Sequence, residues 1–295
     1  MRIGSFEVSG TFPELKEPHA LAILRPWIDV GNVGTMTLQY LEEKLEAREL
    51  ARLAVPGHYF DFTRYRPLMY YHGERREVIV PNTVISYARR EGIEHDFVFL
   101  HLLEPHMFGE RYVASLWRML QELGVRRYCL LGSMYDVVPH TRPLLVSGSV
   151  SGATASEDFE RAGMQTSDYE GPTTITTLVA RQAQQEGIET MTSIVHIPQY
   201  TQLDEDYIGE VRLLQVLETI YGLPVDANLI QKAEQQLAEL DVAVEQNPQV
   251  KSAVEELESH YDDRVMAKRQ ETTKPRLSPE IEKFLREMEK RFRQD

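Results

Sequence analysis

The chain has a single cysteine, Cys129, in 295 residues, so no internal disulfide can form. This fits a reducing compartment, and we expect a cytoplasmic protein. Long apolar runs are also missing, because none approaches the roughly 18 residues that a membrane helix needs. The N-terminus lacks the layout of a signal peptide. These absences predict a protein with no membrane partner.

Basic residues are scarce: 32 Lys and Arg stand against 46 Asp and Glu, which gives a net charge of −14. The acidity is spread along the chain. Residues 223–295 hold 12 basic and 16 acidic residues, a net charge of −4, so the remaining residues carry −10. A protein with this charge repels a phosphate backbone, and we therefore expect no nucleic-acid partner.

Signatures of catalysis are absent as well. The sequence has no Gly-x-Ser-x-Gly elbow, and Cys129 falls within a predicted buried strand. Ser133, which follows a glycine at the end of that strand, stays a candidate nucleophile. His101, Glu104 and His106 match neither the helical His-Glu-x-x-His pattern nor a structural zinc set. We therefore predict no metal and no cofactor, and we assign no catalytic residue.

Three segments of one kind indicate an α/β fold. Each has the polar end of a helix, a glycine where a left-handed conformation costs least, and then an apolar run typical of a buried strand. The glycines are Gly92, Gly124 and Gly187, and the runs are Phe97–Leu102, Tyr128–Leu131 and Met191–Ile197. Repeated units of this type predict a mostly parallel sheet flanked by helices, with right-handed crossovers.

A further strand, turn and helix are predicted near the start. Ala20–Ile28 is apolar enough for a central strand, and helical spacing runs from Val33 to Leu45. The Gly31-x-x-Gly34 turn between them places amides at a helix start, which can hold an anion. It lacks the lysine of a phosphate loop, so we favour a turn that serves close packing.

Three other segments have weaker patterns. Residues 1–19 predict a lead-in arm or an edge strand. The aromatic-rich residues 59–71, followed by 77–80, predict a β-hairpin or a pair of edge strands, and their aromatics suit a subunit contact. Residues 147–171 are rich in Ser, Gly and Thr and predict a long loop, either a lid or simply flexible.

The last part of the chain is predicted to be helical. Tyr207–Tyr221 is a helix that packs on the sheet, and three more helices follow with no strand candidate. Two of them form an antiparallel hairpin, and the third begins at Ser278-Pro279. We expect an α/β core domain over residues 1–222 and a C-terminal helical subdomain over 223–295.

The segment Tyr128–Ser151 is the most informative stretch. After its strand, two prolines bracket His140, Thr141 and Arg142 and hold that tripeptide extended. Open α/β sheets bind ligands beyond the carboxyl ends of their strands. The other predicted strands of this chain are also followed by polar residues. The candidate ligand or structural cluster at this edge is Asp29, Asn32, Glu104, His140, Thr141, Arg142 and His196. Such a set suits acid–base chemistry or carboxylate or phosphate binding, or else structural ion pairs and hydrogen bonds.

These motifs also carry a family resemblance. Val138–Pro143, together with Asp29–Asn32, Glu104-Pro105, Val195–Tyr200 and Leu257–Asp262, resembles the proteasome assembly chaperone two family in its long, mainly actinobacterial form. The resemblance runs from about residue 20 to the end. It implies a core similar to nucleoside phosphorylases and related hydrolases, without their catalytic residues. The chain departs from members with a hydrophobic-Tyr-x tail, because it ends in Lys290–Asp295.

Two functions are compatible with this sequence. The first is a non-catalytic, chaperone-like scaffold that binds itself as a homo-oligomer and binds another protein complex. The alternative is a binder of nucleosides, carboxylates or phosphates, or a hydrolase- or phosphorylase-type enzyme, at the carboxyl edge of the sheet. The missing nucleophile favours the first function.

Overall fold

A computed structural model describes residues 1–73, 75–89, 92 and 94–273, and the chain divides into two units between Gln246 and Asn247. In the first unit, helix α6 (Ala227–Glu245) packs against α5 (Tyr207–Tyr221). Helix α6 therefore belongs with the sheet, whereas the sequence places the start of a helical subdomain at residue 223. The described part of the second unit is the helix α7 (Pro248–Thr273). The helix predicted from Ser278 lies outside the described residues.

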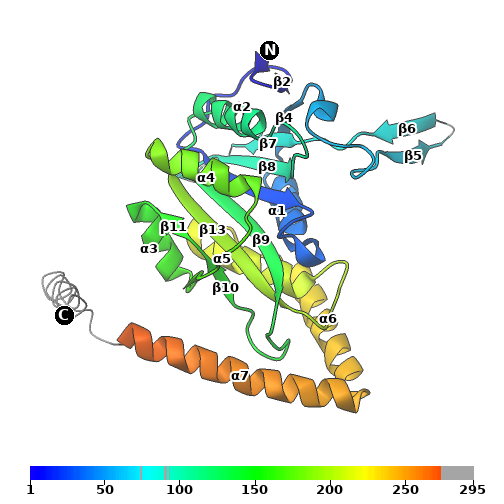
Figure 1. Cartoon of the computed structure of the whole chain (residues 1–295), viewed down its shortest axis with the longest axis vertical. Helices are drawn as coiled ribbons and strands as arrows, with labels where there is room; N and C mark the ends of the chain where they lie inside the picture. Colours follow the sequence, from blue (N-terminus) through cyan, green and yellow to red (C-terminus); the bar gives the residue numbers. More distant parts are fainter. Residues whose placement is uncertain (74, 90–91, 93, 274–295) are drawn as a thin grey trace, which may run out of the picture. The chain divides into compact units, whose positions relative to one another are not determined.

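Four parallel strands form the centre of the large sheet (Figure 1). Their order is β8 (Phe97–Leu103), β3 (His19–Arg25), β9 (Arg127–Asp136) and β13 (Glu189–Pro198). Helices cover both faces, so these strands are apolar nearly throughout, and residues 20–24 of β3 are fully buried. The predicted α/β class with a mostly parallel centre is confirmed.

Shorter strands extend this centre on both sides. On the β8 side the order continues through β7 (Val84–Ala88), β4 (Arg48–Leu53), β2 (Phe6–Val8) and β1 (Arg2–Ile3), all antiparallel to their neighbours. On the other side, β10 (Val146–Gly148) and β11 (Val150–Ser151) both pair antiparallel with β13, and β12 (Gln165–Thr166) pairs parallel with β10. The edge strand expected within residues 1–19 is therefore present.

Two pairs of helices are the main cover of opposite faces. On one face, α2 (Gly109–Glu122) and α4 (Ile175–Gln185) contribute to a core that includes Leu116, Leu120 and Val179. On the other face, α1 (Val33–Lys44) and α5 contribute to a core that includes Leu38, Leu41 and Leu217, and α3 (Ala153–Arg161) and α6 add to it. The helices predicted from Val33 to Leu45 and over Tyr207–Tyr221 thus pack on the sheet, on the same face.

Three local predictions were wrong. The described residues 84–88 ahead of Gly92 form strand β7 where a helix was predicted, because a glycine with positive φ serves a reverse turn as well as a helix end. Strand β9 does not stop at Gly132, where a Cβ would lie 2.2 Å from the carbonyl oxygen of Ile28. Glycine is needed there for close approach of the backbone. Residues 147–171 hold β10, β11, α3 and β12 in place of one long loop, since Phe159 anchors α3 in the core.

The predicted hairpin is a separate two-stranded sheet, β5 (Leu68–His72) paired with β6 (Arg75–Ile79). It extends away from the large sheet of its unit (Figure 1). Two short 3-10 helices, Val30–Asn32 and Pro56–His58, complete the elements. Within the described residues, no helix is both long and apolar enough to cross a membrane.

Candidate functional site

The carboxyl ends of β3, β8, β9 and β13 lie at one edge of the sheet, since all four strands are parallel. Three of the predicted side chains come after a strand in the chain: Asp29 after β3, Glu104 after β8 and His140 after β9. His196 lies within β13, two residues before its end. The predicted shared edge is therefore present. Each of these four side chains, however, is held by its own set of partners.

Asp29 caps helix α1. Its Oδ1 accepts the backbone N–H groups of Gly34 (2.8 Å) and Thr35 (3.1 Å), and its Oδ2 accepts the Thr35 hydroxyl (2.5 Å). An added Cβ on Gly34 would lie 3.0 Å from both Asp29 Oδ1 and Ile23. The amides at this helix start thus bind the chain's own carboxylate in place of an external anion, and the glycine turn serves close packing.

Asn32 and Glu104 also join separate segments. The Asn32 side chain donates to the carbonyl of Asp204, 2.8 Å away, and so fixes the residues before α5. Glu104 accepts the N–H of Ile175 at 3.1 Å and thereby caps α4 on the face opposite α1. Burial raises the pKa of Glu104. Both acidic residues named from the sequence are therefore helix caps on opposite faces of the sheet.

His140 connects its loop to α6. Its Nδ1 and its backbone N–H both contact the Tyr200 hydroxyl, and its Nε2 lies 3.2 Å from Asp241 Oδ1. The imidazole is buried between these partners, as the structural interpretation of the sequence expects. His140 anchors the proline-bracketed loop on the helix.

A pocket of about 570 Å³ lies beside this loop, between α5 and α6. Thr141 and Arg142 line it, and Val211 and Leu237 give it apolar walls. A second guanidinium, that of Arg212, also lines the pocket and donates to the carbonyl of Leu144 at 2.9 Å. Of the residues named from the sequence, the structure brings only His140, Thr141 and Arg142 together around one cavity.

His196 lies between two groups that sequence reasoning missed. Its Nε2 is 2.7 Å from Ser147 Oγ, and its Nδ1 is 2.6 Å from Asp136 Oδ2. Ser147 is on β10 and Asp136 is the last residue of β9, so three strands meet in this contact. The sequence held no signal for it, because the antiparallel pairing of β10 with β13 is not local.

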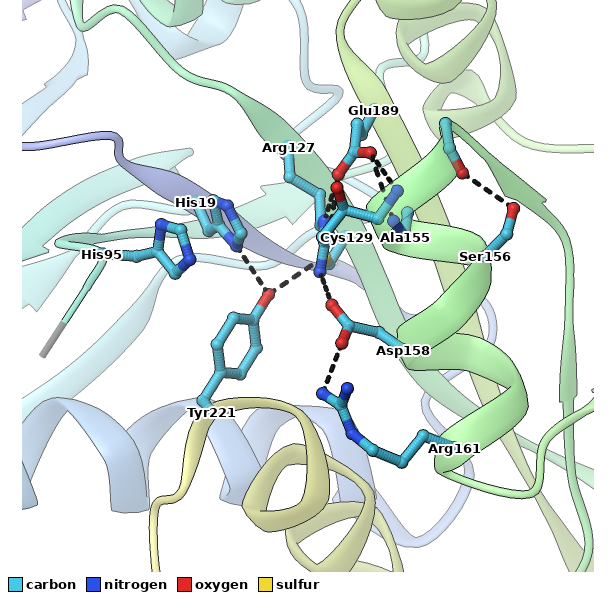
Figure 2. Close-up of polar contacts among 12 residues, drawn as sticks. His19, His95, Arg127, Cys129, Ala155, Ser156, Asp158, Arg161, Glu189 and Tyr221 are labelled. Atoms are coloured by element: carbon cyan, nitrogen blue, oxygen red, sulfur yellow. Dashed lines mark hydrogen bonds and ion pairs between the residues drawn. The ribbon is translucent and has the colours of Figure 1, made fainter.

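The amino edge of the sheet holds a second polar cluster that was not predicted (Figure 2). Arg127, the first residue of β9, is 1% exposed. It donates to Asp158 at 2.6 Å and to Glu189 at 2.9 and 2.7 Å. Glu189 also accepts backbone N–H groups at the start of α3, and Asp158 binds the exposed Arg161. The sequence did hold a signal for this cluster, because Arg127 directly precedes the apolar run of β9. A charged side chain that is buried with such a strand needs an oppositely charged partner.

Neighbouring groups at this edge are held uncharged. His19 stacks on His95, with ring centroids 4.0 Å apart, and its Nδ1 lies 3.0 Å from the Tyr221 hydroxyl. Burial, with His95 and Arg127 nearby, lowers the pKa of His19 to about 3. Burial also raises the pKa of Cys129 to about 11, so this thiol is a poor nucleophile. Among the described residues, no group of three or more His, Cys, Asp and Glu could hold a metal ion.

The β5–β6 hairpin exposes apolar side chains on both of its faces. In its register Met69 pairs with Val78, and Leu68 pairs with Ile79 on the opposite face. Large apolar residues of the hairpin are between 45% and 62% exposed; they are Leu68, Met69, Tyr70, Tyr71, Val78 and Ile79. By contrast, Tyr59 and Phe60, from the same aromatic-rich stretch, are buried in the core.

Comparison with known proteins fits this architecture. A model of the PAC2 family matches residues 23–244. A PAC2 family protein from Streptomyces avermitilis is 25% identical, with a TM-score of 0.71 over 80% of this chain and 99% of its own. A proteasome-assembly chaperone homologue of Mycobacterium tuberculosis is 26% identical, with a TM-score of 0.70 and the same coverage. A Pyrococcus furiosus archaeal proteasome activator, 16% identical, shares the fold with a TM-score of 0.61, over 82% of this chain and 99% of its own.

The sheet, its helices and the family match together define the class of protein. The chain belongs to the PAC2 family. Solved structures of proteasome-assembly chaperone homologues are among its relatives, which agrees with the resemblance seen in the sequence. No protein in a curated set of sequences matches the chain.

Proposed function

We propose that this protein is an assembly-chaperone-like scaffold that acts by binding other protein chains, first of all copies of itself. The exposed apolar hairpin β5–β6 is the observation that carries this proposal. Monomeric soluble proteins rarely expose apolar patches of more than a few hundred Å², and larger ones mark interaction sites. Family membership and the chaperone homologue of Mycobacterium tuberculosis support an assembly role. The reduced, buried Cys129 fits the cytoplasm as its location.

A second copy of the chain is the occupant that we assign to the hairpin. An isolated two-stranded hairpin is marginally stable in water, and β5 and β6 pair only with each other among the described strands. A ribbon that is apolar on both faces needs a cover that is always present. A second copy is present wherever the protein itself is made, so symmetric self-association supplies such a cover once the protein is concentrated enough to associate. The assembled scaffold then offers its remaining surfaces to another protein complex.

The oligomeric state tests this proposal. The subunit mass is 34.0 kDa, and we expect light scattering after size exclusion to give a multiple of it for the wild-type protein. The double variant Val78→Glu/Ile79→Glu places a carboxylate on each face of the hairpin and should run as a monomer. The helix residue Leu178 is also exposed, so Leu178→Glu is the matched control and should leave the oligomer intact. A monomeric wild-type protein would overturn the proposal.

Small-molecule binding is the second candidate, and the pocket beside His140 favours it. Apolar walls with the guanidinium groups of Arg142 and Arg212 suit a ligand with an apolar part and an acidic group. A thermal-shift screen of metabolites separates the two candidates. A ligand whose stabilisation is lost in a folded Arg142→Ala variant would establish this site. The scaffold alone predicts no such ligand.

A further inference from the structure

The contact of Ser147, His196 and Asp136 has the connectivity of a nucleophile relay. The hydroxyl meets one ring nitrogen of His196 at 2.7 Å, and the carboxylate meets the other at 2.6 Å. Both distances are within the range of good hydrogen bonds. Three neighbouring strands hold the members, so their positions are fixed by sheet pairing and not by flexible loops.

The tautomer of His196 follows from its two partners. Asp136 is an acceptor, so the proton of neutral His196 lies on Nδ1. The Nε2 lone pair is then free to accept the Ser147 hydroxyl proton. This is the tautomer that a general base requires, and the carboxylate stabilises the imidazolium that forms when the proton is taken.

Two other polar clusters in the described chain lack this order. Ser86 donates to Glu42, and His101 binds the second oxygen of the same carboxylate at 2.8 Å. The carboxylate lies between serine and histidine there, and the pKa of Glu42 is lowered by its hydrogen bonds with His101 and Ser86 despite burial, so it is a weak base. In the His140 cluster the hydroxyl comes from Tyr200. Of these three clusters, the one at Ser147 alone has a histidine between an aliphatic hydroxyl and a carboxylate.

We propose that Ser147 is a nucleophile, with His196 as its general base and Asp136 as the positioning residue, and that it takes acyl groups from small uncharged esters. This activity goes beyond the scaffold function and does not depend on the hairpin. Ser147 is 9% exposed and His196 3% exposed, so we expect only a small acyl donor to reach the hydroxyl. It also supplies a nucleophile that sequence motifs did not reveal.

The proposed reaction needs no further reagent than water. Ser147 Oγ attacks the ester carbonyl carbon while its proton passes to His196 Nε2. The bond from that carbon to the alkoxy oxygen breaks, and His196 returns the proton to the leaving alcohol. Water then attacks the acyl-serine, giving one proton to His196. The bond to Ser147 Oγ breaks, His196 reprotonates that oxygen, and the carboxylic acid leaves.

A small alkyl fluorophosphonate tests the nucleophile directly. The Ser147 oxygen would form a bond to phosphorus as fluoride leaves, and peptide mass spectrometry should place the adduct on Ser147. Ser147→Ala should remove the adduct. The neighbouring, exposed Ser149→Ala is the matched control and should label as the wild type does. Circular dichroism of each variant establishes that it is folded.

The base and the positioning residue have separate readouts. His196→Gln should slow labelling by at least roughly 100-fold. Asp136→Asn should also slow labelling strongly, and it should move the pH at which the labelling rate reaches half its maximum, which a purely structural role would not do. Hydrolysis of p-nitrophenyl acetate should follow the same order across the variants. Wild-type protein that takes no adduct on Ser147, or that labels equally well without His196, would overturn the proposal. Either result leaves the oligomer test unaffected.

Discussion

Replacing Arg127 with Met is expected to lower the free energy of unfolding by about 3–5 kcal/mol. The variant removes the guanidinium but leaves the carboxylates of Asp158 and Glu189 beside it, and Asp158 is almost fully buried. A buried charge that loses its partner cannot regain the hydration that it gave up on folding. Urea unfolding followed by circular dichroism measures the loss.

Arg161→Met is the matched control for this prediction. Arg161 binds the same Asp158, but its side chain is 53% exposed, so we expect a loss below about 1 kcal/mol. The triple variant Arg127→Met/Asp158→Asn/Glu189→Gln should regain much of the stability lost, because no unpaired charge is left in the site. If Arg127→Met were no more harmful than Arg161→Met, the cluster would not hold the amino edge of the sheet together.

His19→Asn is expected to change how stability depends on pH. The pKa of His19 is about 3 in the folded protein and 6.5 for the ordinary side chain, so folding favours the neutral form. Between these values the unfolded chain binds one more proton, and the stability contributed by His19 falls as the pH falls. Relative to the variant, the wild-type protein should lose about 2–3 kcal/mol of unfolding free energy between pH 7 and pH 4.5. The exposed His58→Asn is the control and should leave the dependence unchanged.

Glu210 has the opposite effect from His19 on how stability depends on pH. Burial raises its pKa to about 7 from 4.5, with Lys232 lowering it and Glu205 raising it. Between pH 4.5 and pH 7 the folded protein therefore keeps a proton on Glu210 that the unfolded chain releases. The stability that Glu210 contributes falls as the pH rises through this range. Glu210→Gln should make the protein more sensitive to acid, whereas His19→Asn should make it less sensitive. Unfolding curves at several pH values that move in the same direction for both variants would contradict these assignments.

Much of the fold was predictable because its signals are local. The apolar run of β3, the helical spacing of α1, and the glycines at Gly124 and Gly187 each depend on a few neighbouring residues. The errors arose where the same local sequence pattern is compatible with two different secondary structures. A glycine with positive φ follows β7 in a turn, and a Ser- and Gly-rich segment hides the short helix α3.

The candidate site was less predictable, for a physical reason. Parallel topology placed Asp29, Glu104 and His196 at one edge, but local hydrogen bonds decide what each side chain does there. Asp29 and Glu104 satisfy the first amides of helices, a role that any carboxylate before a helix can take. The partners of His196 depend on β10 folding back beside β13, a pairing that strand patterns alone do not specify.

Amide hydrogen exchange over strands β5 and β6, followed by mass spectrometry across a dilution series, tests the central claim most directly. In a free subunit these amides belong to an isolated hairpin and should exchange rapidly. Our account predicts strong protection at high protein concentration, loss of protection on dilution, and no protection at any concentration in Val78→Glu/Ile79→Glu. Rapid exchange in the wild-type protein at every concentration would contradict it.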